Sequence, residues 1–227
     1  MLSAILFDLD GTLVHSDPIH FTAWQNVLQK FNLVIDLEFY RRKISGRTNA
    51  AIIKDILPEL SPEEAERLAE AKEIEFRNLC RQLAPLPGLS DLLSWIKQHN
   101  LKQAIVTNAP PANAQFFLEK LNLTDSFPVV VLAEDAPPGK PHPAPYLLAL
   151  QRLGVKNSEA IVFEDSPSGI QAAIQAGIYT IGVTSTHSAS TLLDMGVAMT
   201  INDFRDERLW ERLNKLLTNP LPCSLVN

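Results

Sequence analysis

The sequence predicts an α/β protein with a doubly wound parallel sheet and an all-helical segment inserted after the first strand. Two observations lead to this fold class. From residue 87 onward, short apolar runs alternate with helical patterns, as in proteins whose parallel sheet is covered by helices on both faces. One further apolar run, at residues 4–7, is separated from this region by a long stretch without a strand pattern.

The stretch after the first strand has the spacing of apolar residues that is typical of helices. Helices are predicted there over residues 18–31, 36–44, 49–57 and 61–83. Asp17 is expected to cap the first of them, with Pro18 at its first position. The fourth opens with a capping box at residues 61–64, and its mixed charges indicate a solvated face.

The remaining elements belong to the sheet and the helices that cover it. Strands are predicted over residues 103–107, 129–132, 160–163, 179–183 and 197–201, and helices over residues 89–99, 112–121, 144–153, 168–176 and 207–217. Residues 1–15 and 85–227 are therefore expected to form a Rossmann-like α/β core, and residues 16–84 a helical cap domain.

Two short connections, residues 13–16 and 84–88, join the predicted cap to the core. No strand pairing is expected across them, so they are predicted to act as hinges. The tail from Thr218, with Pro220 and Pro222, is expected to be loosely attached.

The composition limits the class of protein. The chain has 227 residues, 46% of them hydrophobic, and a formal net charge of -6, which argues against nucleic acid or an anionic membrane as the main partner. Cys80 and Cys223 form no C-x-x-C pair, so neither a disulfide framework nor a zinc site is expected. The apolar run before Asp8 is too short for a signal peptide, and we expect a cytoplasmic protein without a membrane span.

Two carboxylates follow the first strand directly. Asp8 and Asp10 are two residues apart and therefore point to the same side, where their repulsion requires a proton or a cation. A calcium loop is excluded, since glycine stands at its fourth position as Gly11 and the twelfth position is Ile19. From this stretch alone, an ordinary polar turn after a strand remains an alternative explanation.

Polar residues also follow the other predicted strands. Thr107 and Asn108 end the second strand just before a helix, a place that suits an anion but equally an ordinary helix entry. Lys140 follows the third strand between Gly139 and Pro141, on a loop that the prolines stiffen. Because ligands bind at the carboxyl edge of such sheets, this lysine is a candidate for contacting a phosphate and a carboxylate.

The fourth strand ends in a second acidic pair, Glu164 and Asp165. Ser166 before Pro167 is also a good helix cap, so capping is the alternative explanation for this segment. Taken together, acids, a lysine, a hydroxyl group and helix N-termini converge on one edge of the sheet. That combination suits a divalent cation and a phosphate group.

With these motifs in this order, the sequence resembles the haloacid dehalogenase superfamily over nearly its whole length. The helical insertion resembles the cap of the beta-phosphoglucomutase-like and sugar-phosphatase-like members. The resemblance implies that Asp8 attacks phosphorus and that Asp10 exchanges protons with the leaving oxygen and with water. It also implies Mg²⁺ bound by Asp8, the Asp10 carbonyl group and Asp165, with Glu164 in support.

By the same resemblance, Thr107, Asn108 and Lys140 hold the phosphoryl oxygens. The expected activity is hydrolysis of a small phosphorylated metabolite, in particular a sugar phosphate. A monomer is the default expectation for the oligomeric state. Dehalogenase members lack an acid at the Asp10 position, which speaks against that chemistry.

Two alternatives remain, a phosphosugar mutase and a binding protein that keeps the fold without catalysis. The phosphatase is favoured over the mutase because Thr12 follows Gly11, as in the phosphatases it resembles, and because Ser45 and Asn49 stand where mutases carry cations. His20, Arg47 and Asn49 are the candidates for cap contacts with the substrate. A partly buried, hydrogen-bonded histidine is the alternative explanation for His20.

Overall fold

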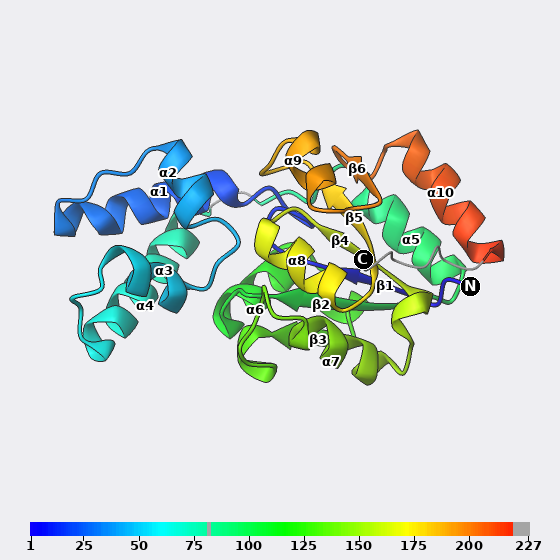
Figure 1. The fold of residues 1–227 in the computed structure, drawn as a ribbon, viewed down its shortest axis with the longest axis horizontal. Helices are drawn as coiled ribbons and strands as arrows, with labels where there is room; N and C mark the ends of the chain where they lie inside the picture. Colours follow the sequence, from blue (N-terminus) through cyan, green and yellow to red (C-terminus); the bar gives the residue numbers. More distant parts are fainter. Residues whose placement is uncertain (81–82, 220–227) are drawn as a thin grey trace.

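The computed structural model describes residues 1–80 and 83–219. The predicted loose tail at Pro220 and Pro222, and Cys223, lie outside these residues. The described chain forms one six-stranded parallel sheet in the order β3-β2-β1-β4-β5-β6 (Figure 1). Its strands are β1 (Ala4–Phe7), β2 (Lys102–Thr107), β3 (Val129–Leu132), β4 (Ala160–Glu164), β5 (Tyr179–Val183) and β6 (Met199–Ile201).

This strand order places the first and fourth strands side by side at the centre of the sheet, where the winding direction reverses. Parallel α/β sheets bind ligands at such a switch point, outside the carboxyl ends of the strands. Phe7 pairs in register with Ile105 of β2 and Phe163 of β4. The acids that follow, Asp8 and Glu164, therefore leave the sheet at the same level.

Helices cover both faces of the sheet, as predicted (Figure 1). The apolar cluster on one face contains residues of α5 (Leu89–Gln98), α6 (Pro111–Lys120) and α10 (Glu207–Thr218). The cluster on the other face contains residues of α7 (Ala144–Leu153) and α8 (Pro167–Gln175), and α9 (Ala189–Asp194) packs on α8. The six-residue helix α9 was not predicted. Four 3₁₀ turns lie at η1 (Gln29–Phe31), η2 (Thr124–Ser126), η3 (Ala133–Asp135) and η4 (Asn157–Glu159).

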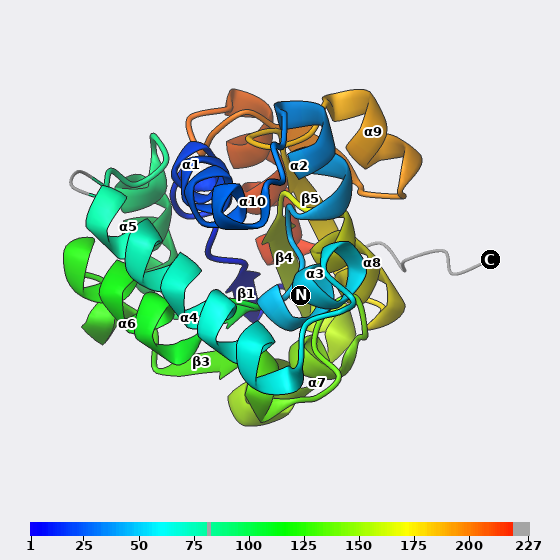
Figure 2. The same ribbon diagram turned by 90° about the vertical axis from the view of Figure 1, so that its left-hand side faces the viewer.

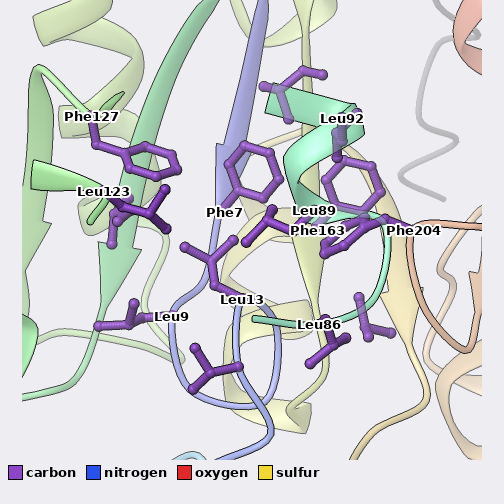
Figure 3. Packing of buried hydrophobic residues seen from close by; sticks show 14 of the residues in the cluster. Phe7, Leu9, Leu13, Leu86, Leu89, Leu92, Leu123, Phe127, Phe163 and Phe204 are labelled. Carbon is purple, nitrogen blue, oxygen red and sulfur yellow. The ribbon is translucent and has the colours of Figure 1, made fainter. Parts of the chain in front are cut away.

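An aromatic cluster holds the centre of the sheet to the helices on one face (Figure 3). The rings of Phe7 and Phe163 stack with centroids 5.4 Å apart. Phe204 meets both rings edge-on, at 6.3 Å from Phe7 and 5.3 Å from Phe163. All three side chains are fully buried, so the two strands that lead to the acidic residues have a rigid base.

The inserted segment forms four helices, which are α1 (Asp17–Leu28), α2 (Leu37–Lys43), α3 (Asn49–Ile56) and α4 (Pro62–Leu79). They share an apolar cluster of their own around Trp24, Tyr40 and Leu68. The four helices lie beside the core in Figure 1, and the view in Figure 2 shows them in front of the sheet. The exact division into cap and core at residues 15/16 and 84/85 remains a prediction.

Three details of the predicted helical segment were wrong. Ser16, not Asp17, occupies the N-cap of α1, and its hydroxyl group does not cap the helix because it donates to Asp10. The fourth helix ends at Leu79 and does not reach Leu83. The connections to the core do pair, since an isolated bridge joins Val14 to Pro85.

Within the described residues, no helix is both long and apolar enough to cross a lipid bilayer. The cytoplasmic location and the monomeric state remain predictions.

Replacing Phe204 by alanine is expected to destabilise the fold by about 3–5 kcal/mol, because it opens a cavity against two stacked rings. Leu193→Ala is the control, since Leu193 is 49% exposed and its truncation should change stability by no more than about 0.5 kcal/mol. Urea unfolding of both variants measures the difference. Equal effects of the two substitutions would contradict the central role of the aromatic cluster.

Candidate functional site

Three buried carboxyl groups surround one lysine at the switch point. Asp8 follows β1, and Glu164 and Asp165 stand at the end of β4. Oxygens of the three acids lie within 4.8 Å of one another. Lys140 reaches them from the loop after β3, and its Nζ donates to Asp8 Oδ1 and Glu164 Oε1, both at 2.7 Å.

The electrostatics of this cluster favour a bound cation. Burial raises the pKa of the Asp8 carboxyl group to about 8, even though Lys140 lowers it. Burial, followed by the charges of Glu164 and Asp8, raises the pKa of Asp165 well above its usual range. A divalent ion among these oxygens would stabilise their ionised forms. The residues present therefore fit a divalent cation with oxygen ligands, such as the Mg²⁺ that the resemblance implies.

Hydrogen bonds and close packing hold Asp165 in place. Its oxygens accept from the hydroxyl groups of Thr12 at 3.1 Å and Thr186 at 2.7 Å. Gly11 has a φ of +82°, and a Cβ there would lie 2.1 Å from Asp165 Oδ2. The glycine of the first motif is thus required both by the backbone turn and by the approach of Asp165.

Glu164 is the fully buried member of the acidic cluster, with an exposure of 0%. Besides Lys140, its carboxylate accepts from the hydroxyl group of Tyr146 at 3.2 Å and from the backbone N–H groups of Asp165 and Ser166, both at 2.9 Å. These contacts orient Lys140 and the turn at the end of β4. Ser166 also caps α8, accepting from the N–H of Gly169, so the capping alternative holds alongside the acidic cluster.

Asp10 belongs to a second hydrogen-bond chain, which leads into the helical segment. Its Oδ1 accepts from Ser16 Oγ at 2.6 Å and lies 2.8 Å from His20 Nε2. Lys72 Nζ lies 2.8 Å from His20 Nδ1. Because an ammonium group only donates, Nδ1 must accept, and Nε2 therefore carries the proton that His20 donates to Asp10. Burial alone would raise the pKa of Asp10, but His20 and Ser16 outweigh it, so that pKa is lowered.

Lys72 and Glu73 extend this series of hydrogen bonds across the interface between α4 and the core. The two side chains form an ion pair at 2.8 Å and are 3% and 7% exposed, so the predicted solvated face was wrong for them. Glu73 also accepts from Asn49 at 2.6 Å and from Asn113 of α6. Arg77 donates to Asn113 at 2.6 Å.

The predicted phosphate ligands lie at the carboxyl edge of the sheet. Thr107 is buried at the end of β2, where its Oγ1 accepts from the N–H of Ala109 at 3.0 Å. The Asn108 side chain accepts from Lys140 N and donates to Lys140 O, both at 3.2 Å. It therefore fixes the backbone of the lysine, and its part in phosphate binding remains a prediction.

Arg47 makes its hydrogen bonds within the inserted segment. Its guanidinium group donates to the carbonyl group of Lys43 at 2.6 Å and to Asp55 Oδ2 and the carbonyl group of Ala51, both at 3.1 Å. Ser45 and Gly46 lie beside it on the loop between α2 and α3. The Gly46 carbonyl group accepts from Ser168 Oγ of the core.

A single cavity connects these groups, between the carboxyl edge of the sheet and the inserted helices. All the predicted site residues line it except Glu164, and they are Asp8, Asp10, His20, Arg47, Asn49, Thr107, Asn108, Lys140 and Asp165. Sequence analysis missed Asp17, Tyr40, Lys72, Glu73 and Asn113, which also line it. None of them carried a signal for the site in the sequence, where Asp17 was explained as a helix cap and Lys72 and Glu73 as part of a solvated face.

Fold and site together define an α/β protein with a buried acidic cluster at the switch point of its sheet, beneath a helical insertion, and this cluster could hold a cation. A profile of the family described as haloacid dehalogenase-like hydrolase matches residues 5–183.

Relatives of known structure or curated function agree with this match. A phosphorylated carbohydrates phosphatase of Thermotoga maritima is 33% identical over 201 residues, which cover 86% of this chain and 92% of the relative. A family IA, variant 3 hydrolase of Entamoeba histolytica superposes with a TM-score of 0.86 at 32% identity, over 96% of this chain and all of the other. A beta-phosphoglucomutase of Clostridium difficile superposes with a TM-score of 0.84 at 26% identity, over 96% of this chain and 100% of the other.

The chain therefore belongs to the haloacid dehalogenase-like hydrolase family. The resemblance inferred from its motifs is confirmed. So is the expected enzyme class, a phosphatase of this family.

Replacing Gly46 by alanine is expected to lower kcat/KM for p-nitrophenyl phosphate about tenfold or more. Gly46 has a φ of +71°, and an added Cβ would lie 2.6 Å from Ser166 Cβ, so the loop must move away from the core. Gly154→Ala is the matched control, because Gly154 also has a positive φ, +63°, but has only Lys102 Nζ nearby, at 3.8 Å. Equal losses of activity in both variants would mean that backbone strain, not contact with the core, is responsible.

Proposed function

We propose that this protein hydrolyses a sugar phosphate or a similar small phosphomonoester with Mg²⁺, through an aspartyl-phosphate on Asp8. The observation that carries the proposal is the buried set of Asp8, Glu164 and Asp165 with Lys140, which opens into the cavity at the switch point. The phosphorylated carbohydrates phosphatase among the relatives supports the same substrate class.

Asp8 is the nucleophile in this proposal. One of its carboxylate oxygens attacks phosphorus, and the bond to the leaving oxygen of the substrate breaks. Lys140 donates to Asp8 in the described structure, which supports a role in which it would donate to the phosphoryl oxygens that gain charge during transfer. Thr107 is the second candidate donor, because it ends the neighbouring strand β2.

Asp10 transfers the protons. It donates one to the leaving oxygen and then removes one from the water molecule that hydrolyses the aspartyl-phosphate, so Asp10 ends as it began. The pKa of Asp10 is lowered by His20 and Ser16 against the effect of burial, which favours the carboxylate form. The negative charge of an incoming phosphate raises the proton affinity of a neighbouring carboxylate, and this supports protonation of Asp10 on substrate binding.

Asp8, Asp165 and the backbone carbonyl group of Asp10 would hold Mg²⁺, with Glu164 in support. When bound, the ion offsets the repulsion between the nucleophile and the phosphate oxygens. Asp165 is already fixed for this task by Thr12 and Thr186.

Asp8→Asn is expected to lower the rate of phosphate release by roughly three orders of magnitude or more, because an amide is a poor nucleophile. EDTA should abolish activity of the unchanged protein, and added Mg²⁺ should restore it. Asp91→Asn, at an exposed aspartate of α5, is the control and should retain full activity. Normal turnover of Asp8→Asn, or of the protein in EDTA, would refute the covalent, metal-dependent mechanism.

A phosphosugar mutase is the second candidate, because a beta-phosphoglucomutase shares the fold closely. The two reactions differ in whether water or a second sugar hydroxyl group accepts the phosphoryl group. A mutase must hold the far phosphate of a bisphosphate intermediate, which requires free cations in the cap. The pairing of Arg47 with Asp55 and the presence of Ser45 and Asn49 in place of cations favour water as the acceptor.

With β-glucose 1-phosphate and a trace of β-glucose 1,6-bisphosphate, free phosphate is expected to accumulate faster than glucose 6-phosphate. Without a cation to retain it, the bisphosphate should leave or be hydrolysed. Coupled assays follow both products in one sample. Rapid isomerisation with little free phosphate would show that a sugar hydroxyl group is the acceptor.

A further inference from the structure

The cations that line the cavity are already paired with acids of the chain. Lys140 is bound to Asp8 and Glu164. Lys72 is bound to Glu73, and Arg47 to Asp55. Among the residues that the structure describes, these are the lysine and arginine side chains that line this cavity. A second anionic group on the substrate would thus find no unpaired lysine or arginine there.

Asp17 adds a negative charge on the side of the inserted helices. It lies at the start of α1 and lines the same cavity as Asp8 and Asp10. Its Oδ1 accepts from the hydroxyl group of Tyr40 at 2.7 Å, and no ion pair with a described cation is formed. Burial, together with the Asp17 carboxylate, raises the pKa of Tyr40, so the phenol stays protonated and keeps Asp17 in place.

We propose that Asp17 is a specificity-determining residue that accepts a hydrogen bond from a substrate hydroxyl group and repels a carboxylate or a second phosphate. The cavity then selects phosphomonoesters whose remaining part is uncharged and hydroxylated. This inference rests on the proposed function, and it concerns how the cavity recognises the part of the substrate that does not carry the phosphate group. A hydroxyl group bound to a carboxylate makes a strong, charge-assisted hydrogen bond, whereas a second carboxylate there is opposed by like charge.

The test compares two substrates that differ in one terminal group. Glucitol 6-phosphate ends in an uncharged hydroxymethyl group, and 6-phosphogluconate ends in a carboxylate on the same six-carbon chain. Phosphate release with Mg²⁺ gives kcat/KM for each. The unchanged protein is expected to prefer glucitol 6-phosphate by at least about tenfold, since like charges in an interface cost several kcal/mol when water is excluded.

Asp17→Asn is expected to reduce this preference about tenfold, mainly by improving the use of 6-phosphogluconate. Asp17→Glu keeps the charge and should keep the preference within about threefold of that of the unchanged protein. Glu59→Gln removes an equal charge from an exposed position of the inserted segment and is the control that should leave the preference unaltered.

Turnover of p-nitrophenyl phosphate, which carries neither hydroxyl groups nor a second charge, separates the two proposals. If neither the unchanged protein nor any variant releases phosphate from p-nitrophenyl phosphate, the proposed function fails. If the unchanged protein hydrolyses it but prefers 6-phosphogluconate, the role of Asp17 is refuted. An unaltered preference in an Asp17→Asn variant that turns over p-nitrophenyl phosphate normally would also refute it.

Discussion

The repulsion among three buried carboxyl groups is the constraint on which the site depends. The strand order makes β1 and β4 neighbours, so Asp8, Glu164 and Asp165 must emerge together. Lys140 balances only part of this charge, although it contacts two of the acids. Burial without full compensation is costly, and a cation bound among these oxygens would offset that cost. The rigid aromatic base beneath the two strands prevents the acids from separating to relieve that cost.

The inserted helices share polar contacts with the core, so their position affects the groups at the switch point. Asp10 contacts Ser16 and His20 at the start of the insertion, and His20 in turn contacts Lys72 of α4. Glu73, next to that lysine, is bound by Asn113 of the core helix α6. A shift of α4 against α6 would therefore disturb the hydrogen bonds that lower the pKa of Asp10. In the proposed mechanism, proton transfer by Asp10 is therefore coupled through these side chains to the placement of the insertion.

Much of the fold and of the acidic site could be predicted because the signals are local in sequence. Each acidic motif directly follows an apolar strand, and parallel strands place such residues on one edge. The pair Lys72 and Glu73 could not be predicted, since a charged helix segment is usually solvated and its burial depends on Asn113, some forty residues further along the chain. Capping preference alone could not distinguish Ser16 from Asp17, because the decisive partner of the serine is Asp10.

Under the two proposals made above, the start of α1 joins the chemical step to the choice of substrate. Ser16 donates to Asp10, and the next residue, Asp17, faces the cavity and accepts from Tyr40. The acids at the strand ends are fixed by sheet register, so their chemistry is constrained by the core. Asp17 is held by a side chain of α2, an element that packs outside the sheet. Substrate preference can therefore change through the insertion without disturbing the buried carboxylates, provided that the contact between Ser16 and Asp10 is kept.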